Sequence, residues 1–130
     1  MHLGSEHSLV VHSHDGMDEI SISAPTNISE LRAGKLSSYT VKPEDFGLQT
    51  VSVEQIVVAD PAESLAVIDA VLAGRKGAAR DIVILNAGAG IYVSGLVSTL
   101  EQGVEMAKTS IDSGKALAAK QAYVVATQEA

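Results

Sequence analysis

The segment over residues 82–93, IVILNAGAGIYV, limits the possible folds of this chain more than any other stretch. Its residues are apolar or small on nearly every side of a helix, and Gly95 follows where a helix can end. A helix that is apolar all round is normally covered on all sides. We therefore expect an interior helix here, packed within a larger body of structure.

The first third of the chain has the pattern of strands. Residues 8–13 form a short β-branched run, residues 19–23 alternate apolar with polar, and residues 35–41 form a third run. Asp15-Gly16 predicts a turn between the first two. Residues 24–31 continue extended, and a tight turn at residues 32–34 makes residues 35–41 a hairpin partner. We expect residues 8–13, 19–23 and 35–41 to belong to one sheet.

The second half has the pattern of helices. Asp60 is a predicted N-cap, Pro61 takes the first helical position, and Gly74 ends the helix. Leu65, Ile68, Val71 and Leu72 fall at helical spacing and predict one buried stripe. Another helix is expected to begin at Ser98 or Thr99 and to end or bend at Gly114, before a last helical segment. Strands first and helices second indicate one layered α/β unit, with its helices packed on the sheet.

Three short strands are too few to cover the apolar helix over residues 82–93. The first residues also lead almost directly into a strand, with no element before it. Both features predict that sequence is missing in front of this chain. The alternative is a small domain with a dimer interface.

Composition excludes several classes of function. A net charge of -7 and singly spread basic residues argue against a nucleic-acid surface. The absence of cysteine excludes disulfides and thiolate zinc sites and fits a reducing compartment. No signal peptide and no apolar run long enough to span a membrane is visible. We expect a cytoplasmic protein that binds neither nucleic acid nor membrane.

The stretch HSHDGMDEIS, residues 12–21, concentrates charge between two apolar runs. Asp18 and Glu19 are two hard oxygen donors after a glycine turn, and Mg²⁺ favours one or two carboxylates together with phosphate oxygens and water. Adjacent side chains on a strand point to opposite faces, so both can reach one cation only if the turn extends through Asp18. The simpler interpretation is a pair of solvated turn acids.

Two further patterns predict little chemistry. His12 and His14 would share one face of a strand and, with Asp15, could hold Zn²⁺ or Ni²⁺, but two imidazoles and one carboxylate are a weak signal. The NAGAG run, residues 86–90, lacks the third glycine and the downstream acid of a dinucleotide site. Its small residues are better explained by the close approach of a neighbouring helix.

Four segments together resemble the C-terminal end of the anthranilate phosphoribosyltransferase family, in order and in spacing: SLVVHSHDGMDEISISAPTNISEL, YTVKPEDFGL, RDIVILNAGAGIYVSG and GVEMAKTSIDSGKAL. The resemblance covers nearly the whole chain from about Gly4 onward. In that family the glycine-rich diphosphate loop and the anthranilate-binding residues come before these segments. No GTGGD-like run occurs in these 130 residues.

The resemblance implies a fold. It is the C-terminal part of the larger α/β domain of a phosphoribosyltransferase/nucleoside-phosphorylase-like fold, with short β-strands followed by packed helices. Residues 1–130 would form a single partial domain, β-rich over 8–42 and helical over 60–127. The N-terminal helical domain and the diphosphate-binding part would be absent.

The resemblance also implies a function, the Mg²⁺-dependent transfer of a phosphoribosyl group from phosphoribosyl diphosphate to anthranilate in tryptophan biosynthesis. Asp18 and Glu19 would hold the metal, and no catalytic residue is expected in this chain. The complete enzyme would be a homodimer, whereas this chain alone would be inactive and would self-associate. The alternatives are a small non-catalytic metal- or partner-binding domain, or a sibling phosphoribosyl- or nucleoside-transferring enzyme.

Overall fold

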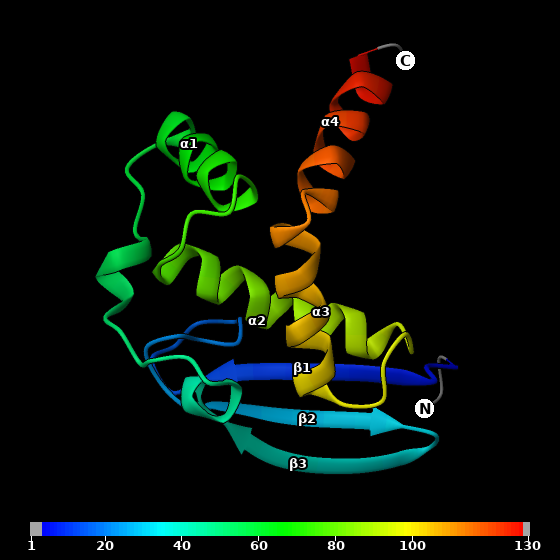
Figure 1. The fold of residues 1–130 in the computed structure, drawn as a ribbon. Coiled ribbons are helices and arrows are strands. Elements are labelled where there is room, and N and C mark those ends of the chain that lie inside the picture. The colour runs from blue at the N-terminus through cyan, green and yellow to red at the C-terminus, as the bar shows by residue number, and fades with distance from the viewer. Residues whose placement is uncertain (1–3, 129–130) are drawn as a thin grey trace.

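A computed structural model describes residues 4–128 and places a three-stranded antiparallel sheet beneath a group of helices (Figure 1). The sheet has the order β1-β2-β3 and is formed by β1 (His7–Ser13), β2 (Thr26–Arg32) and β3 (Lys35–Val41). Its inner face alternates along β2, where Thr26, Ile28 and Glu30 are buried and Asn27 and Ser29 are exposed. The prediction of strands followed by helices is confirmed.

In the hairpin of β2 and β3, the paired strands are close neighbours in the sequence. Arg32 pairs with Lys35, so only Ala33 and Gly34 connect the two strands. Both have positive φ, 49° for Ala33 and 76° for Gly34, as a type I′ turn requires. The predicted tight turn and hairpin partner are therefore confirmed.

The predicted strand over residues 19–23 is wrong. These residues form bends in the loop between β1 and β2, and the strand that pairs with β1 is β2. Ile20 and Ile22 are buried as their alternation suggested, but Ser21 between them is also buried. Their backbone groups bond to side chains and to Val51 rather than to a neighbouring strand. The alternation of apolar and polar residues over 19–23 therefore belongs to a buried loop and not to a strand.

Two short 3₁₀ helices, η1 (Pro43–Phe46) and η2 (Val53–Ile56), lead from the sheet to α1 (Pro61–Leu72). The Asp60 carboxylate caps α1 by accepting a 2.8 Å hydrogen bond from the Glu63 N–H, as predicted. The predicted buried stripe is wrong, because Leu65 and Ile68 are 51% and 45% exposed while Val71 is buried. The face of α1 that meets the core passes through Val67 and Val71 instead.

The remaining helices are α2 (Ala78–Val93), α3 (Leu100–Asp112) and α4 (Lys115–Gln128). Thr99 caps α3, and Gly114 separates α3 from α4, both as predicted. In Figure 1, α2 runs beside β1 and α3 crosses α2, whereas α1 and α4 lie farther from the sheet. The main direct contact of a helix with the sheet is that of α2 with β1, so the expectation that the helices from Pro61 onward all pack on the sheet is wrong. No helix within residues 4–128 is long and apolar enough to span a membrane.

Small residues allow α2 and α3 to pack in backbone contact. A Cβ added to Gly103 would lie 2.2 Å from the Gly88 carbonyl oxygen, and one added to Gly88 would lie 2.6 Å from the Val104 nitrogen. The interpretation of the NAGAG run as a close helix contact is therefore confirmed. The expectation of an all-round interior helix is not met, because Val83, Ala87 and Gly90 are exposed while Ile84, Leu85 and Gly88 are buried.

Candidate functional site

The loop over residues 14–25, here called the 14–25 loop, joins β1 to β2 and carries both predicted metal ligands. Its ends are held together by a hydrogen bond from the His14 N–H to the Pro25 carbonyl, 2.9 Å long. Gly16 turns the chain with a φ of 91°, a value that L side chains rarely adopt. The turn predicted at Asp15-Gly16 is confirmed.

Asp15 organises the first half of this loop. Its carboxylate accepts hydrogen bonds from the Ser21 hydroxyl at 2.6 Å, the Met17 N–H at 3.2 Å and the Ser23 hydroxyl. Burial alone would favour the neutral acid, but the hydrogen bonds outweigh it and hold the pKa of Asp15 far below its usual range. Asp15 therefore stays ionised and draws the two sides of the loop together.

Asn86 of α2 fixes the second half of the loop. Its Oδ1 accepts a 2.9 Å hydrogen bond from the Ile20 N–H, and its Nδ2 donates to the Ile20 carbonyl at 3.0 Å. The same nitrogen donates to the Ile82 carbonyl at 3.0 Å, one helical turn earlier. A side chain from α2 thus supplies the backbone pairing that a neighbouring strand would otherwise provide.

Asp18 and Glu19 are exposed between these two anchors. Within residues 4–128, neither carboxylate forms a hydrogen bond or an ion pair with another residue. Glu19 borders a shallow depression on α2, together with Met17, Val83 and Ala87. Both residues lie in bends rather than in a strand, so the regular alternation of a strand does not send their side chains to opposite faces.

The donor set of this loop fits a hard cation that brings other ligands with it. Mg²⁺ is usually bound by one or two carboxylates plus water and phosphate oxygens. No group of three His, Asp or Glu residues that could hold a metal by itself occurs in the described part of the chain. The loop can therefore contribute two anionic oxygens to a shared metal site but does not form a complete protein cage.

The alternative metal site, with two histidines as ligands, is not formed in this structure. His14 lies beyond the end of β1, so it does not share a strand face with His12. Its Nε2 lies 3.2 Å from Asn27 Oδ1, and the Asp15 carboxylate is already bound by two serines. The structure therefore does not bring His12, His14 and Asp15 together as one set of ligands.

Comparison with known proteins places this chain in a family. A family model described as "Glycosyl transferase family, a/b domain" matches residues 1–117, which include the 14–25 loop and Asn86. The chain belongs to this glycosyl transferase family. The α/β fold implied by the sequence resemblance is confirmed with it.

Relatives of this glycosyl transferase chain include the anthranilate phosphoribosyltransferases of Thioalkalivibrio sulfidiphilus, 51% identical over 114 residues, and of Marinomonas sp., 53% identical over 116 residues. Each match covers 88% of this chain and 34% of the relative. The solved anthranilate phosphoribosyltransferase of Thermus thermophilus has a TM-score of 0.82 and 34% identity, covering 92% of this chain and 35% of that one. The chain therefore spans about a third of the length of these relatives.

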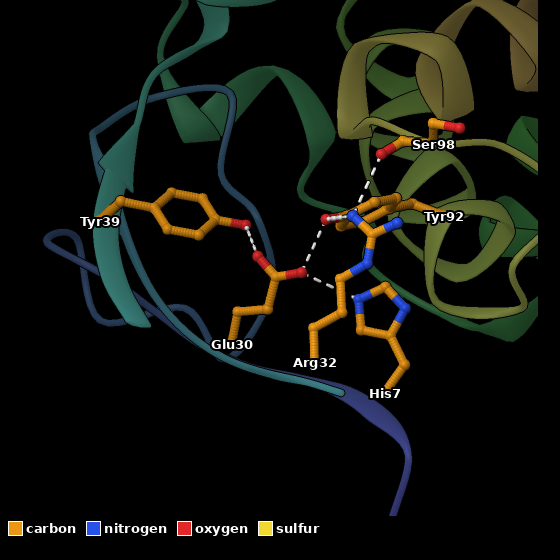
Figure 2. Close-up of polar contacts among 6 residues, drawn as sticks. All are labelled: His7, Glu30, Arg32, Tyr39, Tyr92 and Ser98. Atoms are coloured by element: carbon orange, nitrogen blue, oxygen red, sulfur yellow. Dashed lines mark hydrogen bonds and ion pairs between the residues drawn. The ribbon is translucent and has the colours of Figure 1, made fainter. Parts of the chain in front are cut away.

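A second polar cluster of this glycosyl transferase chain lies at the far end of the strands from the 14–25 loop (Figure 2). The buried Glu30 carboxylate accepts hydrogen bonds from the Tyr92 hydroxyl at 2.6 Å and the Tyr39 hydroxyl at 3.0 Å. His7 Nε2 lies 2.9 Å from the same carboxylate, and Arg32 donates to the Tyr92 hydroxyl at 2.9 Å. Burial favours neutral Glu30, but these partners outweigh it and hold its pKa below the usual value.

The Glu30 cluster joins the sheet to the C-terminal end of α2 and serves the fold. Its carboxylate is engaged on both oxygens and is 7% exposed, so it offers no free group to a ligand. Sequence reasoning did not identify it. The signal was present, because alternation along β2 places Glu30 on the same inner face as Thr26 and Ile28.

Proposed function

We propose that this chain forms part of an anthranilate phosphoribosyltransferase, which transfers the phosphoribosyl group of phosphoribosyl diphosphate to anthranilate in tryptophan biosynthesis. The observation that carries the proposal is 51–53% identity to two such enzymes over nearly nine-tenths of the chain. A reaction at the ribose anomeric carbon also agrees with membership of a glycosyl transferase family. The chain would then be a single partial domain of that enzyme, β-rich over residues 8–42 and helical over residues 60–127.

Asp18 and Glu19 would hold Mg²⁺ in this enzyme. Their carboxylates are exposed, have no competing partner among residues 4–128, and are placed by a loop that is anchored on both sides. A solved variant of the Saccharomyces cerevisiae anthranilate phosphoribosyltransferase, 25% identical to this chain with a TM-score of 0.76, has Mg bound. The donor chemistry and the relative's metal support the same assignment.

The roles of the chain's own residues follow from the geometry. Bound Mg²⁺ would neutralise charge that develops on the departing diphosphate. Asp18 and Glu19 would bind and orient the metal and transfer no proton, and Asp15 would fix the turn that presents them. The residues that bind diphosphate and anthranilate would belong to the rest of the enzyme, a cytoplasmic homodimer. The chain alone should therefore show no turnover.

The test is substitution of the carboxylates in the complete enzyme. Asp18→Asn or Glu19→Gln keeps the side-chain size and removes an anionic oxygen. Activity should fall by about ten- to a thousand-fold, the range seen when one electrostatic stabiliser of developing charge is lost. High Mg²⁺ should restore part of it by mass action, while the fold should survive because both side chains are exposed.

The matched control is His14→Asn in the same loop, which should be nearly neutral. Full activity of both carboxylate variants at limiting Mg²⁺ would contradict the metal assignment. An intact, folded complete enzyme with no anthranilate phosphoribosyl transfer would contradict the proposed reaction itself.

A further inference from the structure

The Asn86 side chain forms hydrogen bonds outside its own helix, to the residue that follows the candidate metal ligand Glu19. Of its three hydrogen bonds, two bind the N–H and the carbonyl of Ile20, the residue directly after Glu19, across 66 positions of sequence. Its orientation is unambiguous, because Oδ1 meets an N–H donor while Nδ2 meets two carbonyl oxygens. Both ends of the side-chain amide are thus used to hold the backbone of one residue, Ile20, in the 14–25 loop.

We propose that Asn86 is a positioning residue for the Asp18–Glu19 pair. The inference rests on the proposed function, since it assigns to Asn86 the task of aiming the carboxylates that would hold Mg²⁺. Asn86 itself need touch neither metal nor substrate. It acts through Ile20, whose backbone sets the direction in which Glu19 leaves the loop.

The support beneath Asn86 is rigid. Its Nδ2 is tied to the Ile82 carbonyl of its own helix, which fixes the side-chain rotamer from behind. Two residues farther along α2, Gly88 lies in backbone contact with α3, where an added Cβ would lie 2.6 Å from Val104. The loop is therefore attached to a part of α2 that is held by a close backbone contact with α3.

Such rigidity matters for the cation that these carboxylates would bind. Mg²⁺ demands nearly ideal octahedral geometry with short metal–oxygen distances, so small displacements of a ligand weaken binding. Partners that orient metal ligands typically change metal affinity or activity by about 10- to 100-fold when removed. Loss of the Asn86 contacts should leave the carboxylates present but poorly aimed.

The experiment measures the Mg²⁺ requirement of the complete enzyme carrying Asn86→Ala, both as the dissociation constant of Mg²⁺ by titration calorimetry and as the Mg²⁺ concentration for half-maximal activity. We expect it to rise by about 10- to 100-fold, while kcat at saturating Mg²⁺ changes much less. Asn86→Asp is the second variant, because it keeps the size and the acceptor for the Ile20 N–H but loses both donors. Its carboxylate would face the Ile20 and Ile82 carbonyl oxygens with no proton between them, so it should raise the Mg²⁺ requirement at least as much as Asn86→Ala.

The control is Ile84→Val, on the buried face of the same helix, where the side chain is fully buried and apolar and forms no hydrogen bond to the loop. It should lower thermal stability without moving the Mg²⁺ requirement. A purely structural role for Asn86 predicts the same behaviour for Asn86→Ala, and that result would overturn the inference.

A double variant separates this inference from the function on which it rests. Asn86→Ala combined with Glu19→Gln should raise the Mg²⁺ requirement by less than the product of the two single effects, because both act through one ligand. If Glu19→Gln raises the requirement and Asn86→Ala does not, the positioning role is wrong and the metal assignment stands. If neither Glu19→Gln nor Asp18→Asn has an effect, the metal assignment itself fails.

Discussion

Gly88 of α2 and Gly103 of α3 meet through their backbones. A Cβ on Gly103 would lie 2.2 Å from the Gly88 carbonyl oxygen, far inside contact distance. The obstructing atom belongs to a helix backbone and cannot rotate away. The two helices can therefore keep this separation only while both positions remain glycine.

Gly103→Ala should destabilise the chain. Overpacking a core typically costs about 1–3 kcal/mol, and here the upper part of that range should outweigh the roughly 1 kcal/mol that alanine gains over glycine in a helix. Thermal unfolding followed by circular dichroism measures the loss. Gly90→Ala is the control, since Gly90 is exposed on α2 with nothing within 4 Å of an added Cβ. It should stabilise by about 0.5–1 kcal/mol, and equal effects of the two variants would contradict this account.

Tyr92→Phe should destabilise the junction between β2 and α2. The change removes the hydroxyl that donates to Glu30 at 2.6 Å and accepts from Arg32 at 2.9 Å. A buried group left short of a hydrogen bond costs about 1–3 kcal/mol. Urea unfolding measures the change in free energy. Ser38→Ala is the control, because its hydroxyl interaction with Ser29 is exposed on the other face of the sheet, and a loss as large as that of Tyr92→Phe would argue against a special role for the cluster.

Stability should fall in acid through Glu30. Its pKa is lower in the folded chain than the usual unfolded value of about 4.3. Its contribution is thus complete above that value and is lost as the pH falls through the lower pKa of the folded state. Unfolding free energies measured from pH 7 to pH 3 should decline less steeply for Glu30→Gln than for the unsubstituted chain. Parallel curves would contradict the prediction, and the decline that remains in Glu30→Gln should include Asp15, whose pKa is also lowered.

The isolated chain should self-associate. Several large apolar side chains of the helices are exposed, including Leu65 at 51%, Tyr123 at 71% and Val125 at 54%. Contiguous exposed apolar surface promotes association in water. Size-exclusion chromatography with light scattering should give a mass above 13.4 kDa. A clean monomer that binds no dye for apolar surface would contradict this expectation.

Local chemistry in the sequence predicted the elements whose partners are near in the chain. The cap at Asp60, the turn at Ala33-Gly34 and the ends at Gly74 and Gly114 each depend on residues within a few positions. The loop over residues 19–23 was beyond such reasoning. Its backbone is satisfied by Asn86, 66 positions away, and no local pattern distinguishes that arrangement from a strand with one covered face.

Burial was predicted correctly only for apolar side chains that other described residues cover. Val71 and Ile84 are buried as predicted, whereas Leu65, Ile68 and Val83, for which the sequence also predicts burial, are exposed. For the candidate site, the turn predicted at Asp15-Gly16 is confirmed, and the metal role of Asp18 and Glu19 stays a prediction. The supports from Asp15 and Asn86 could not be predicted, because they depend on how the loop folds back on itself and on a contact with a distant helix.

During synthesis, the ribosome would release the β2–β3 hairpin early, and its two-residue turn lets it close at once. The 14–25 loop must wait for Asn86, which is translated 66 residues after Ile20. At about 5–20 residues per second, that delay is on the order of 3 to 13 seconds. Over this interval Ile20 and its neighbours have no backbone partner from α2, so the nascent chain carries an unfinished loop beside a finished hairpin. The carboxylates would thus be set in place only after the helix behind them has left the ribosome.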